Sequence, residues 1–373
     1  MATAAPPFPE PTGAQRSFTR PKPCAANSLA PSLVRVAVIG YGFAGRCFHS
    51  YLAGLTPGLV LHGIASRNPE TRKKIVAEKK CKAYDSVETA VADPQVDLIV
   101  VASPTVAHAS QAIAALEAGK HVVVDKPACL NDVEFDAMAA AAGKSGKLLT
   151  FFHNRRWDGD YLTLKKCMAD GQLGELRRTE MAWGSFGMWG GWRGKKEMGG
   201  GKLYDLGAHL IDQTLLLNPG PVDSVFCRMH HDFPEYSIES QAVIVLAFAS
   251  GATGIIDVSS LAAIPKPRFA AYGTKGAFVK YGLDPQEKAM IAGDIDAARE
   301  EEANYAEYAD GKSKSRIPTL PGRWRSFYEN VADALAGHAE PAVKVPEVRR
   351  TVAVIDAAFE SARTGQTVVP AVR

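Results

Sequence analysis

The sequence lacks several features that mark specialised classes of protein. No apolar run in its 373 residues approaches the roughly 18 needed to cross a bilayer, so we expect no membrane partner. The six cysteines are scattered without a Cys-x-x-Cys pair, which argues against a disulfide framework and a zinc site, and we expect no bound metal. The formal net charge of +3 is too small to indicate nucleic acid as a partner. These absences predict reduced thiols and a cytoplasmic location.

Residues 1–32 lack hydrophobic periodicity and are rich in proline, alanine, serine and threonine, which predicts a disordered N-terminal extension. They contain no apolar segment of the kind that a secretory signal needs. The scarcity of acidic residues leaves a transit peptide as an alternative, but prolines interrupt the amphipathic helical spacing that such a peptide requires. The rest of the chain is long enough for two domains.

The stretch Val34–Gly45 joins a β-branched run to the glycine pattern Gly40-x-Gly42-x-x-Gly45, and a helical pattern follows at once. Strand, tight turn and helix together are the context in which this pattern indicates dinucleotide binding. Gly40 permits the turn, Gly42 lets the backbone approach a pyrophosphate, and Gly45 lets the helix pack close to the strand. The first N–H groups of the helix are unpaired and partly positive, so they suit a phosphate. The stretch therefore predicts a nucleotide site.

Strands and helices alternate through the first half of the folded chain. The apolar strands are continuous, as in a parallel sheet covered on both faces, so we predict a doubly wound Rossmann domain over residues 33–152. The predicted strands are Leu33–Ile39, Leu59–Ala65, Leu98–Ala102, Val122–Asp125 and Leu148–Phe152. The predicted helices are Ala44–Leu55, Pro69–Lys79, Ser86–Ala92, Ala107–Ala118 and a helix that Asn131 caps and that ends at Ala142.

After about residue 153 longer strands follow one another without helices between them, which predicts a second α/β domain over 153–373 with an antiparallel sheet. The predicted strands are Leu176–Trp183, Val222–Met229, Ser240–Phe248, Thr253–Ser259, Phe269–Tyr272 and Ala277–Tyr281. Predicted helices cover Tyr161–Ala169 and Leu206–Leu217, and two more amphipathic helices end the chain. We expect the acid-rich segment 284–320 to be an exposed excursion.

The choice of nucleotide is usually made at the end of the second strand, where an acidic residue binds the ribose 2′-OH of NAD. Here that strand ends in Ser66 and Arg67, without an acid. Arg67 can pair with a 2′-phosphate and Ser66 can donate a hydrogen bond to it, so we predict that NADP(H) is preferred over NAD(H). The alternative is that Arg67 is only a solvated residue after a strand.

Three further motifs carry a family resemblance: Ser103-Pro104-Thr105-x-x-His108, Asp125-Lys126-Pro127, and Gly199-Gly200-Gly201 followed by Asp205 and His209. Together with the glycine fingerprint they resemble the Gfo/Idh/MocA oxidoreductases over about residues 33–365. The stretches Phe151–Asp158 and Tyr281–Glu287 look like the NADP-dependent scyllo-inositol dehydrogenase branch of that family. The resemblance implies a Rossmann domain followed by an α/β domain whose open, mainly antiparallel sheet mediates homodimers or homotetramers.

The resemblance implies that Lys126, Asp205 and His209 are catalytic, and that the bond between Lys126 and Pro127 is cis. From the residues alone, Lys126 follows the carboxyl end of a parallel strand, where doubly wound folds bind ligands. Asp205 and His209 lie four apart on a predicted helix and share one face. His209 can take the hydroxyl proton of a substrate, a neighbouring carboxylate would orient its ring, and Lys126 can polarise the substrate oxygen. The sequence does not decide whether Lys126 or His209 takes the first proton.

The remaining site residues complete the prediction. The nucleotide site is expected to contain Gly40, Gly42, Phe43, Ala44, Gly45, Ser66, Arg67, Ser103, Pro104, His108, Asp125 and Lys126. The substrate site is expected to contain Lys126, Asn154, Arg155, Asp158, Asp205 and His209, with an interdomain ion pair as the alternative for Arg155. Asp212, one turn beyond Asp205, can face the site or face away from it. Trp183, Trp189 and Trp192 form a sugar platform or a lid, or pack in the core.

The sequence thus predicts an NADP-dependent oxidoreductase that interconverts a secondary alcohol and a ketone on a cyclic polyol or sugar, with an inositol as the first candidate. An aldose dehydrogenase or a sugar-ketone reductase of the same family is the alternative among enzymes. A non-catalytic NADP(H)-sensing regulator is the alternative from another class, and the presence of Lys126, Asp205 and His209 argues against it.

Overall fold

The computed structural model describes residues 33–372. The predicted N-terminal extension and Cys24 lie outside the described residues, and the five cysteines within them are free thiols.

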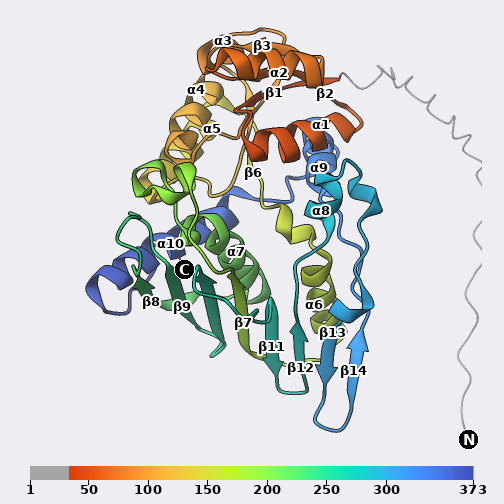
Figure 1. Ribbon diagram of the computed structural model, residues 1–373, viewed down its shortest axis with the longest axis vertical. Coiled ribbons are helices and arrows are strands. Elements are labelled where there is room, and N and C mark those ends of the chain that lie inside the picture. The colour runs from red at the N-terminus through yellow and green to blue at the C-terminus, as the bar shows by residue number, and fades with distance from the viewer. Residues whose placement is uncertain (1–32, 373) are drawn as a thin grey trace, which may run out of the picture. The chain divides into compact units, whose positions relative to one another are not determined.

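A six-stranded parallel sheet forms the first half, in the order β3-β2-β1-β4-β5-β6 (Figure 1). Its strands are β1 (Val34–Ile39), β2 (Leu59–Ala65), β3 (Lys82–Tyr84), β4 (Leu98–Val101), β5 (His121–Val124) and β6 (Leu149–Phe151). This is the strand order of a Rossmann domain, so the predicted doubly wound sheet is confirmed. The short strand β3 is not predicted from the sequence, because three residues carry too little alternation to be recognised.

The connecting helices of this half are η1 (Ala44–His49), α1 (Ser50–Leu55), α2 (Pro69–Lys79), α3 (Val87–Val91), η2 (Thr105–Ala107), α4 (His108–Glu117) and α5 (Asp132–Ser145). The predicted first helix begins with the π-turns of η1 and continues as α1. Asn131 caps α5 as predicted, since its side chain accepts a hydrogen bond from the N–H of Glu134 at 3.0 Å.

An eight-stranded sheet forms the second half, in the order β14-β13-β12-β11-β7-β10-β9-β8. Its strands are β7 (Leu176–Gly184), β8 (Val222–His230), β9 (Gln241–Phe248), β10 (Thr253–Ser259), β11 (Phe269–Gly273), β12 (Ala277–Lys280), β13 (Ala306–Ala309) and β14 (Lys314–Ile317). Every neighbouring pair is antiparallel except β7 and β10, which are parallel. The predicted open and mainly antiparallel sheet is therefore confirmed.

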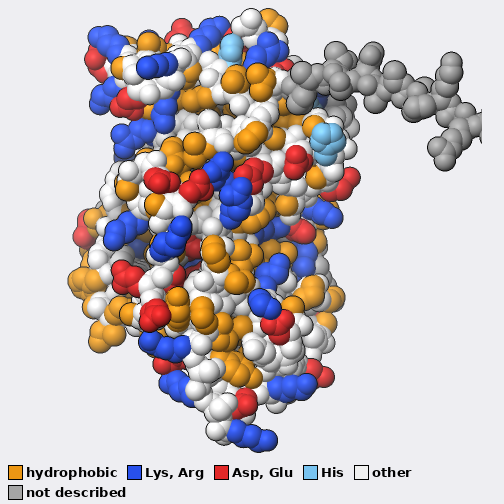
Figure 2. Space-filling model, turned by 90° about the vertical axis from the view of Figure 1, so that its right-hand side faces the viewer, with side chains coloured by type: hydrophobic (Ala, Val, Ile, Leu, Met, Phe, Trp, Pro, Cys, Tyr) orange, Lys and Arg blue, Asp and Glu red, His pale blue; other side chains and the backbone are white. Residues whose placement is uncertain are grey.

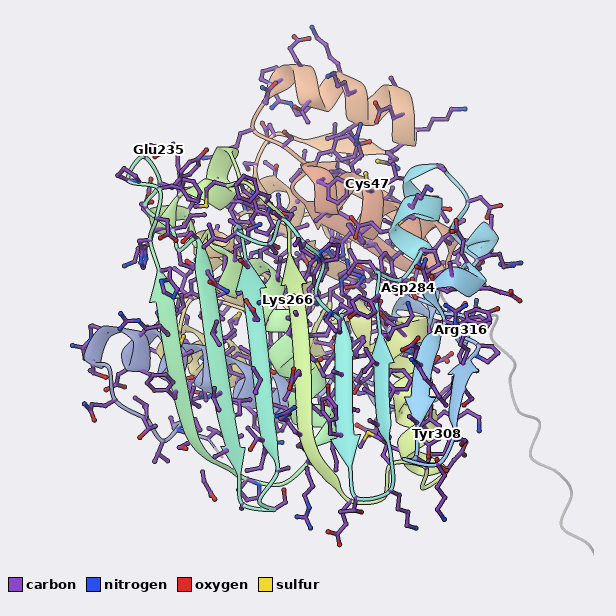
Figure 3. All side chains as sticks on the ribbon, turned by 60° about the horizontal axis from the view of Figure 1, so that its bottom comes forward. Cys47, Glu235, Lys266, Asp284, Tyr308 and Arg316 are labelled. Carbon is purple, nitrogen blue, oxygen red and sulfur yellow. The ribbon has the colours of Figure 1, made fainter. Side chains whose placement is uncertain are left out.

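One face of the eight-stranded sheet packs against α6 (Gly159–Ala169), α7 (Ala208–Leu217) and α10 (Val345–Thr364). The opposite face is turned to the viewer in Figure 3, and no described helix crosses it. Along β9 the side chains alternate between buried and half-buried, which is the pattern of a sheet with one covered face. The second hydrophobic core lies between the sheet and these helices.

The expectation that residues 284–320 form an exposed excursion is right about the exposure of many of these residues, but wrong about their place in the fold. The segment contains α8 (Gln286–Ile291), η7 (Ile295–Ala297) and η8 (Glu302–Asn304), and then the hairpin β13–β14, which extends the sheet at one edge. Figure 3 labels Tyr308 and Arg316 on this hairpin. The strands were not recognised because they have four residues each and are rich in charge, as edge strands often are.

The C-terminal part of the chain returns to the first sheet. Trp324, Phe327 and Tyr328, at the start of α9 (Arg325–Leu335), belong to the core around the parallel sheet, and α9 packs against α1 (Figure 1). Within residues 33–372, none of the helices combines the length and the apolarity that a membrane crossing needs.

Candidate active site

A groove of about 570 Å³ lies at the carboxyl ends of β1, β2, β4 and β5. This is where an open α/β sheet binds its ligands. All the predicted nucleotide-site residues except one line it: Gly40, Gly42, Phe43, Ala44, Ser66, Arg67, Ser103, Pro104, His108, Asp125 and Lys126. The exception is Gly45.

The three glycines of the fingerprint have different surroundings. A Cβ on Gly45 would lie 2.1 Å from the backbone oxygen of Gly40, so Gly45 is needed for close packing of helix and strand. Gly40 has a φ of 105°, which only glycine adopts easily. A Cβ on Gly42 would meet no atom within 4 Å, because this position faces the open groove. The backbone at Gly42 therefore leaves room for a pyrophosphate, and the loop fits a dinucleotide.

The loop after β2 carries the predicted selectivity residues. Ser66 and Arg67 both line the groove, and Arg67 is exposed. Arg72 of α2 donates hydrogen bonds to the backbone oxygens of Ser66 and Arg67 at 2.9 and 3.0 Å. This contact fixes the backbone of the loop that contributes Ser66 and Arg67 to the groove. Glu88 of α3 also lines the groove, and no sequence motif identified it.

Asp125 sits at the end of a buried chain of side chains. Its Oδ1 accepts a hydrogen bond from the backbone N–H of Lys126 at 2.8 Å, and its Oδ2 lies 3.6 Å from Nε2 of His49. Nδ1 of the buried His49 lies 2.7 Å from the hydroxyl of Tyr328. Burial alone would raise the pKa of Asp125, but His49 and Lys126 lower it to about 2. Asp125 is therefore a carboxylate at neutral pH, held directly behind Lys126.

His108 connects two loops at the groove. Its ring nitrogens lie 2.8 Å from the backbone oxygens of Pro127 and Ser103. The ring is buried, and burial lowers its pKa. His108 therefore holds two loops together at the groove.

A second cavity of about 990 Å³ adjoins the groove. Some residues line both spaces: Phe43, Ala44, Asp125, Lys126, Arg193 and Asp205. A ligand in the groove and a ligand in the cavity would therefore meet at Lys126 and Asp205.

Lys126 and Asp205 form a partly buried ion pair between the two halves of the fold. Nζ of Lys126 pairs with Oδ1 of Asp205 and donates to its backbone oxygen at 2.8 Å. Nε of Arg193 lies 3.1 Å from the other carboxylate oxygen. Burial would raise the pKa of Asp205, but Lys126 and Arg193 lower it, so the carboxylate bridges two cations. The peptide bond between Lys126 and Pro127 is cis, as the resemblance implies.

His209 lies at the start of α7, directly after the π-turns of η6 (Leu203–Gly207), and lines the same cavity. Its ring is buried and stacks on Trp183 at 6.1 Å between centroids. Burial lowers its pKa well below the usual value, and the nearby cations Lys126 and Arg155 lower it further. The imidazole is therefore neutral at pH 7. The expectation that a neighbouring carboxylate orients this ring is wrong for Asp205, whose oxygens are taken by Lys126 and Arg193.

The predicted substrate residues of the η3 region (Asn154–Trp157) separate into two groups. Asn154 and Arg155 line the cavity. Arg155 also pairs with Asp158 at 3.3 Å and with Glu287 at 2.8 Å. Asp158 does not line the cavity, because it is fully buried and accepts a hydrogen bond from Nε1 of Trp324 at 2.7 Å. The prediction that Asp158 contacts the substrate is therefore wrong.

Asp212 also faces away from the cavity. It makes hydrogen bonds to Arg156 at 2.6 and 2.8 Å, and Arg156 in turn pairs with Glu347 of α10. These are structural ion pairs.

Sequence reasoning missed a wall of the cavity that comes from the connection between β12 and β13. Asp284, labelled in Figure 3, lines the cavity together with Glu287, Arg299, Glu300 and Asn304. The acid-rich composition of this segment is typical of a solvent-exposed stretch, and the resemblance of Tyr281–Glu287 to a family branch is the one signal in the sequence that points to the site. Trp183 and Trp189 line the cavity and also pack on the second core, whereas Trp192 lines the groove. Among residues 33–372, no group of three or more His, Cys, Asp or Glu side chains is arranged to hold a metal ion.

Comparison with known proteins gives two family matches. Residues 34–153 match an oxidoreductase family with an NAD-binding Rossmann fold, and residues 161–279 match the GFO/IDH/MocA C-terminal domain. The chain is 34% identical to the uncharacterized oxidoreductase YdgJ of Escherichia coli, over 88% of this chain and 96% of the relative. It is 28% identical to the scyllo-inositol 2-dehydrogenase (NADP(+)) IolW of Bacillus subtilis, over 90% and 96%.

Among solved structures, the oxidoreductase yvaA of Bacillus subtilis superimposes with a TM-score of 0.84 at 28% identity, over 91% of this chain and 99% of that one. The glycine cradle and Lys126 lie within the first matched segment, and Asp205 lies within the second. The chain is a member of the Gfo/Idh/MocA oxidoreductases, a family with a nicotinamide-nucleotide-binding Rossmann fold, and its relatives include an inositol dehydrogenase.

Proposed function

We propose that this protein is an NADP(H)-dependent oxidoreductase that interconverts a secondary alcohol and a ketone on a cyclic polyol or sugar, with an inositol as the first candidate. The observation that carries the proposal is that the nucleotide groove and the larger cavity share Lys126 and Asp205. A nicotinamide ring entering from the groove would meet a small polyol beside a lysine, a carboxylate and a neutral imidazole.

The bound nicotinamide would supply the hydride acceptor or donor, and the residues of the chain would manage the proton and the substrate oxygen. Lys126 has three N–H donors, of which two are directed at Asp205, so one remains for a substrate oxygen. Nδ1 of His209 has no hydrogen-bond partner among the described residues. Because the neutral imidazole lines the cavity, its ring can exchange a proton with the substrate hydroxyl. Asn154 and Arg155 would hold neighbouring hydroxyl groups.

The preference for NADP(H) rests on the loop after β2. Arg67 and Ser66 line the groove, and the loop carries no acid that would repel a 2′-phosphate. The name of the Bacillus inositol dehydrogenase, which includes NADP(+), supports the same preference. Basic and acidic side chains alternate on the face drawn in Figure 2, and no described patch there offers a long basic track for nucleic acid.

We also propose that two or four copies associate through the open face of the eight-stranded sheet. Phe226 is 38% exposed on β8, and the outward residues Val243, Val245 and Ile255 of β9 and β10 are half-buried. Such a row of apolar side chains on an uncovered sheet is typical of an obligate interface. Analytical ultracentrifugation of the wild type and of Phe226→Glu tests this, and a monomeric wild type would refute it.

The proposed activity is tested by following NADPH absorbance with a panel of inositol stereoisomers, aldoses and their ketones. Lys126→Met and His209→Ala are expected to lower kcat by about 100-fold or more while NADPH still binds. Lys74→Met, at an exposed position of α2 that lines neither space, is the matched control. Near wild-type kcat in both site variants would refute the assigned roles, and no turnover of any polyol or sugar by the wild type would refute the activity. Nucleotide binding without turnover would instead favour the regulator.

A further inference from the structure

The glycine motif before Asp205 ends in a lysine that the proposed reaction does not use. The side chain of Lys202 is fully buried, with 0% of its surface exposed. Its Nζ makes no hydrogen bond with any residue between 33 and 372. Nζ instead lies 3.7 Å from the centroid of the Trp189 ring. A buried ammonium whose neighbour is an aromatic face is a cation–π contact without competing water.

The backbone around Lys202 is fixed by a buried carboxylate. Oε1 of Glu239 accepts a hydrogen bond from the N–H of Leu203 at 2.7 Å. Gly201 has a φ of 118°, and a Cβ there would lie 2.7 Å from Oε2 of Glu239. The chain can approach Glu239 this closely only through glycine. The direction of the Lys202 side chain is therefore determined by the fold and is not a choice among surface rotamers.

The position of Lys202 is unfavourable for a charge. Burial lowers its pKa to about 8, although Asp205 and Glu239 both favour the charged form. The other cation nearby, Arg193, is directed at Asp205. Glu239 is itself buried, and its pKa is raised by burial. A lysine in such a place does not increase stability, so its contact with Trp189 needs another explanation.

Trp189 belongs to the wall of the substrate cavity, whereas Lys202 does not reach that cavity. Trp189 therefore contacts the ammonium and also contributes to the wall of the space for substrate. Trp189 is followed by Gly190 and Gly191, which offer no side chains to hold the ring. The other tryptophan of the cavity, Trp183, is also held by buried cations, with Arg155 and Arg268 at 4.3 and 5.0 Å from its ring centroid. Both tryptophans of the cavity wall thus contact buried positive charge.

We propose that Lys202 is a positioning residue that holds the Trp189 ring flat against the cavity, so that this ring is a platform for the apolar C–H face of a cyclic polyol or sugar. The inference rests on the proposed function for its substrate class. The contact between Lys202 and Trp189 is independent of that function. Aromatic faces suit cyclic polyols because the ring hydrogens of such a substrate form an apolar surface while its hydroxyl groups point outward.

The contact is tested without substrate by tryptophan fluorescence. The emission of the wild type is expected to change with a midpoint near pH 8, because the ammonium loses its charge next to the indole. The change is expected to disappear in Trp189→Phe and in Lys202→Met. Trp189→Phe keeps Lys202 intact, so the test does not depend on one variant folding. A wild type without this transition, or a transition that persists in Trp189→Phe, would overturn the contact.

The platform is tested by kinetics at pH 7 with the polyol or sugar that the wild type turns over. Lys202→Met is expected to raise KM for this substrate by about tenfold, with kcat within about twofold and the Kd of NADPH unchanged. Lys202→Arg keeps the charge and is expected to lie closer to the wild type. An unchanged KM in Lys202→Met, or an equal loss in NADPH affinity, would overturn the platform. A wild type inactive on every polyol and sugar would overturn the proposed function and the substrate part of this inference, whereas a missing fluorescence transition would leave the proposed function standing.

Discussion

Lys202 and Lys280 make a matched pair for testing what a buried charge costs this fold. Both side chains are fully buried. Nζ of Lys280 donates to the backbone oxygen of Tyr281 at 2.6 Å and pairs with Glu300 at 3.0 Å. Nζ of Lys202 has only the Trp189 ring. Replacing each lysine by methionine keeps the approximate volume and removes the charge, so we expect opposite effects on stability.

The magnitude follows from the pKa. The difference between the usual lysine value of 10.5 and about 8 corresponds to about 3 kcal/mol, which is the cost of burying the charged form. Losing the cation–π contact offsets about 1–2 kcal/mol of this, so Lys202→Met should stabilise the protein by about 1–2 kcal/mol at pH 7. Lys280→Met leaves the carboxylate of Glu300 without its partner and should destabilise the protein by about 3–5 kcal/mol.

The pH dependence of Lys202→Met has a definite sign. Below about pH 8 the lysine is charged in both the folded and the unfolded chain. Burial of the charge therefore destabilises the folded wild type fully, and Lys202→Met shows its full gain in the free energy of unfolding. Between about 8 and 10.5 the folded chain loses the proton first, so the stability of the wild type rises relative to the variant. Above pH 10.5 the stability gained by Lys202→Met from removing the charge is lost.

Urea unfolding followed by circular dichroism, without nucleotide, measures these differences at pH 7 and at pH 10. A destabilised Lys202→Met at pH 7, or a difference from the wild type that does not change with pH, would refute the reasoning. Lys280→Met is the control for a general effect of losing a buried lysine. If both variants lose the same stability, the distinction between a paired and an unpaired buried charge has no basis here.

Two further predictions concern the nucleotide groove. Arg67→Ala should weaken NADPH binding by about 10- to 150-fold and leave NADH binding unchanged, because a charge-assisted hydrogen bond contributes about 1.5–3 kcal/mol. Titration with both nucleotides measures the two affinities. An unchanged preference for NADPH over NADH would exclude Arg67 as the residue that selects the nucleotide. Gly42→Ala should weaken both nucleotides without lowering Tm, since its Cβ points into the open groove, whereas Gly45→Ala should lower Tm because its Cβ would lie 2.1 Å from a backbone oxygen. Equal Tm values for the two glycine variants would contradict this division of roles.

The sequence predicted most of the parallel half, because its signals are local. Apolar strands of four to seven residues, helices with caps such as Asn131, and glycines at fixed spacing all report on neighbours in the chain. The segment 284–320 was misjudged for the same reason. Its acidic residues predicted exposure to solvent. Glu300 instead pairs with the buried Lys280, a contact between two segments that no local sequence pattern connects.

Several residues of the candidate site were also predicted from the sequence, but their pairings were not. Lys126, Asp205 and His209 were identified from motifs, and the structure brings all of them to one cavity. Which carboxylate pairs with which cation was not available from the motifs. Asp205 binds Lys126 instead of orienting His209, and Asp158, four residues beyond the well-placed Asn154, is buried behind the cavity.

The sequence by itself determined most strands and helices of the parallel half, the glycine cradle and the residue types that can carry a hydride-transfer reaction. Only the tertiary structure decided the partners of the charged side chains. Those partners distinguish a residue of the candidate site from a residue in a structural ion pair. The physical reason is that backbone periodicity is set by neighbours a few positions away, whereas the state of a buried charge depends on solvent exclusion and on groups supplied by remote segments. Lys202 illustrates this, since a lysine after three glycines looks like a surface residue until the fold places it under Trp189.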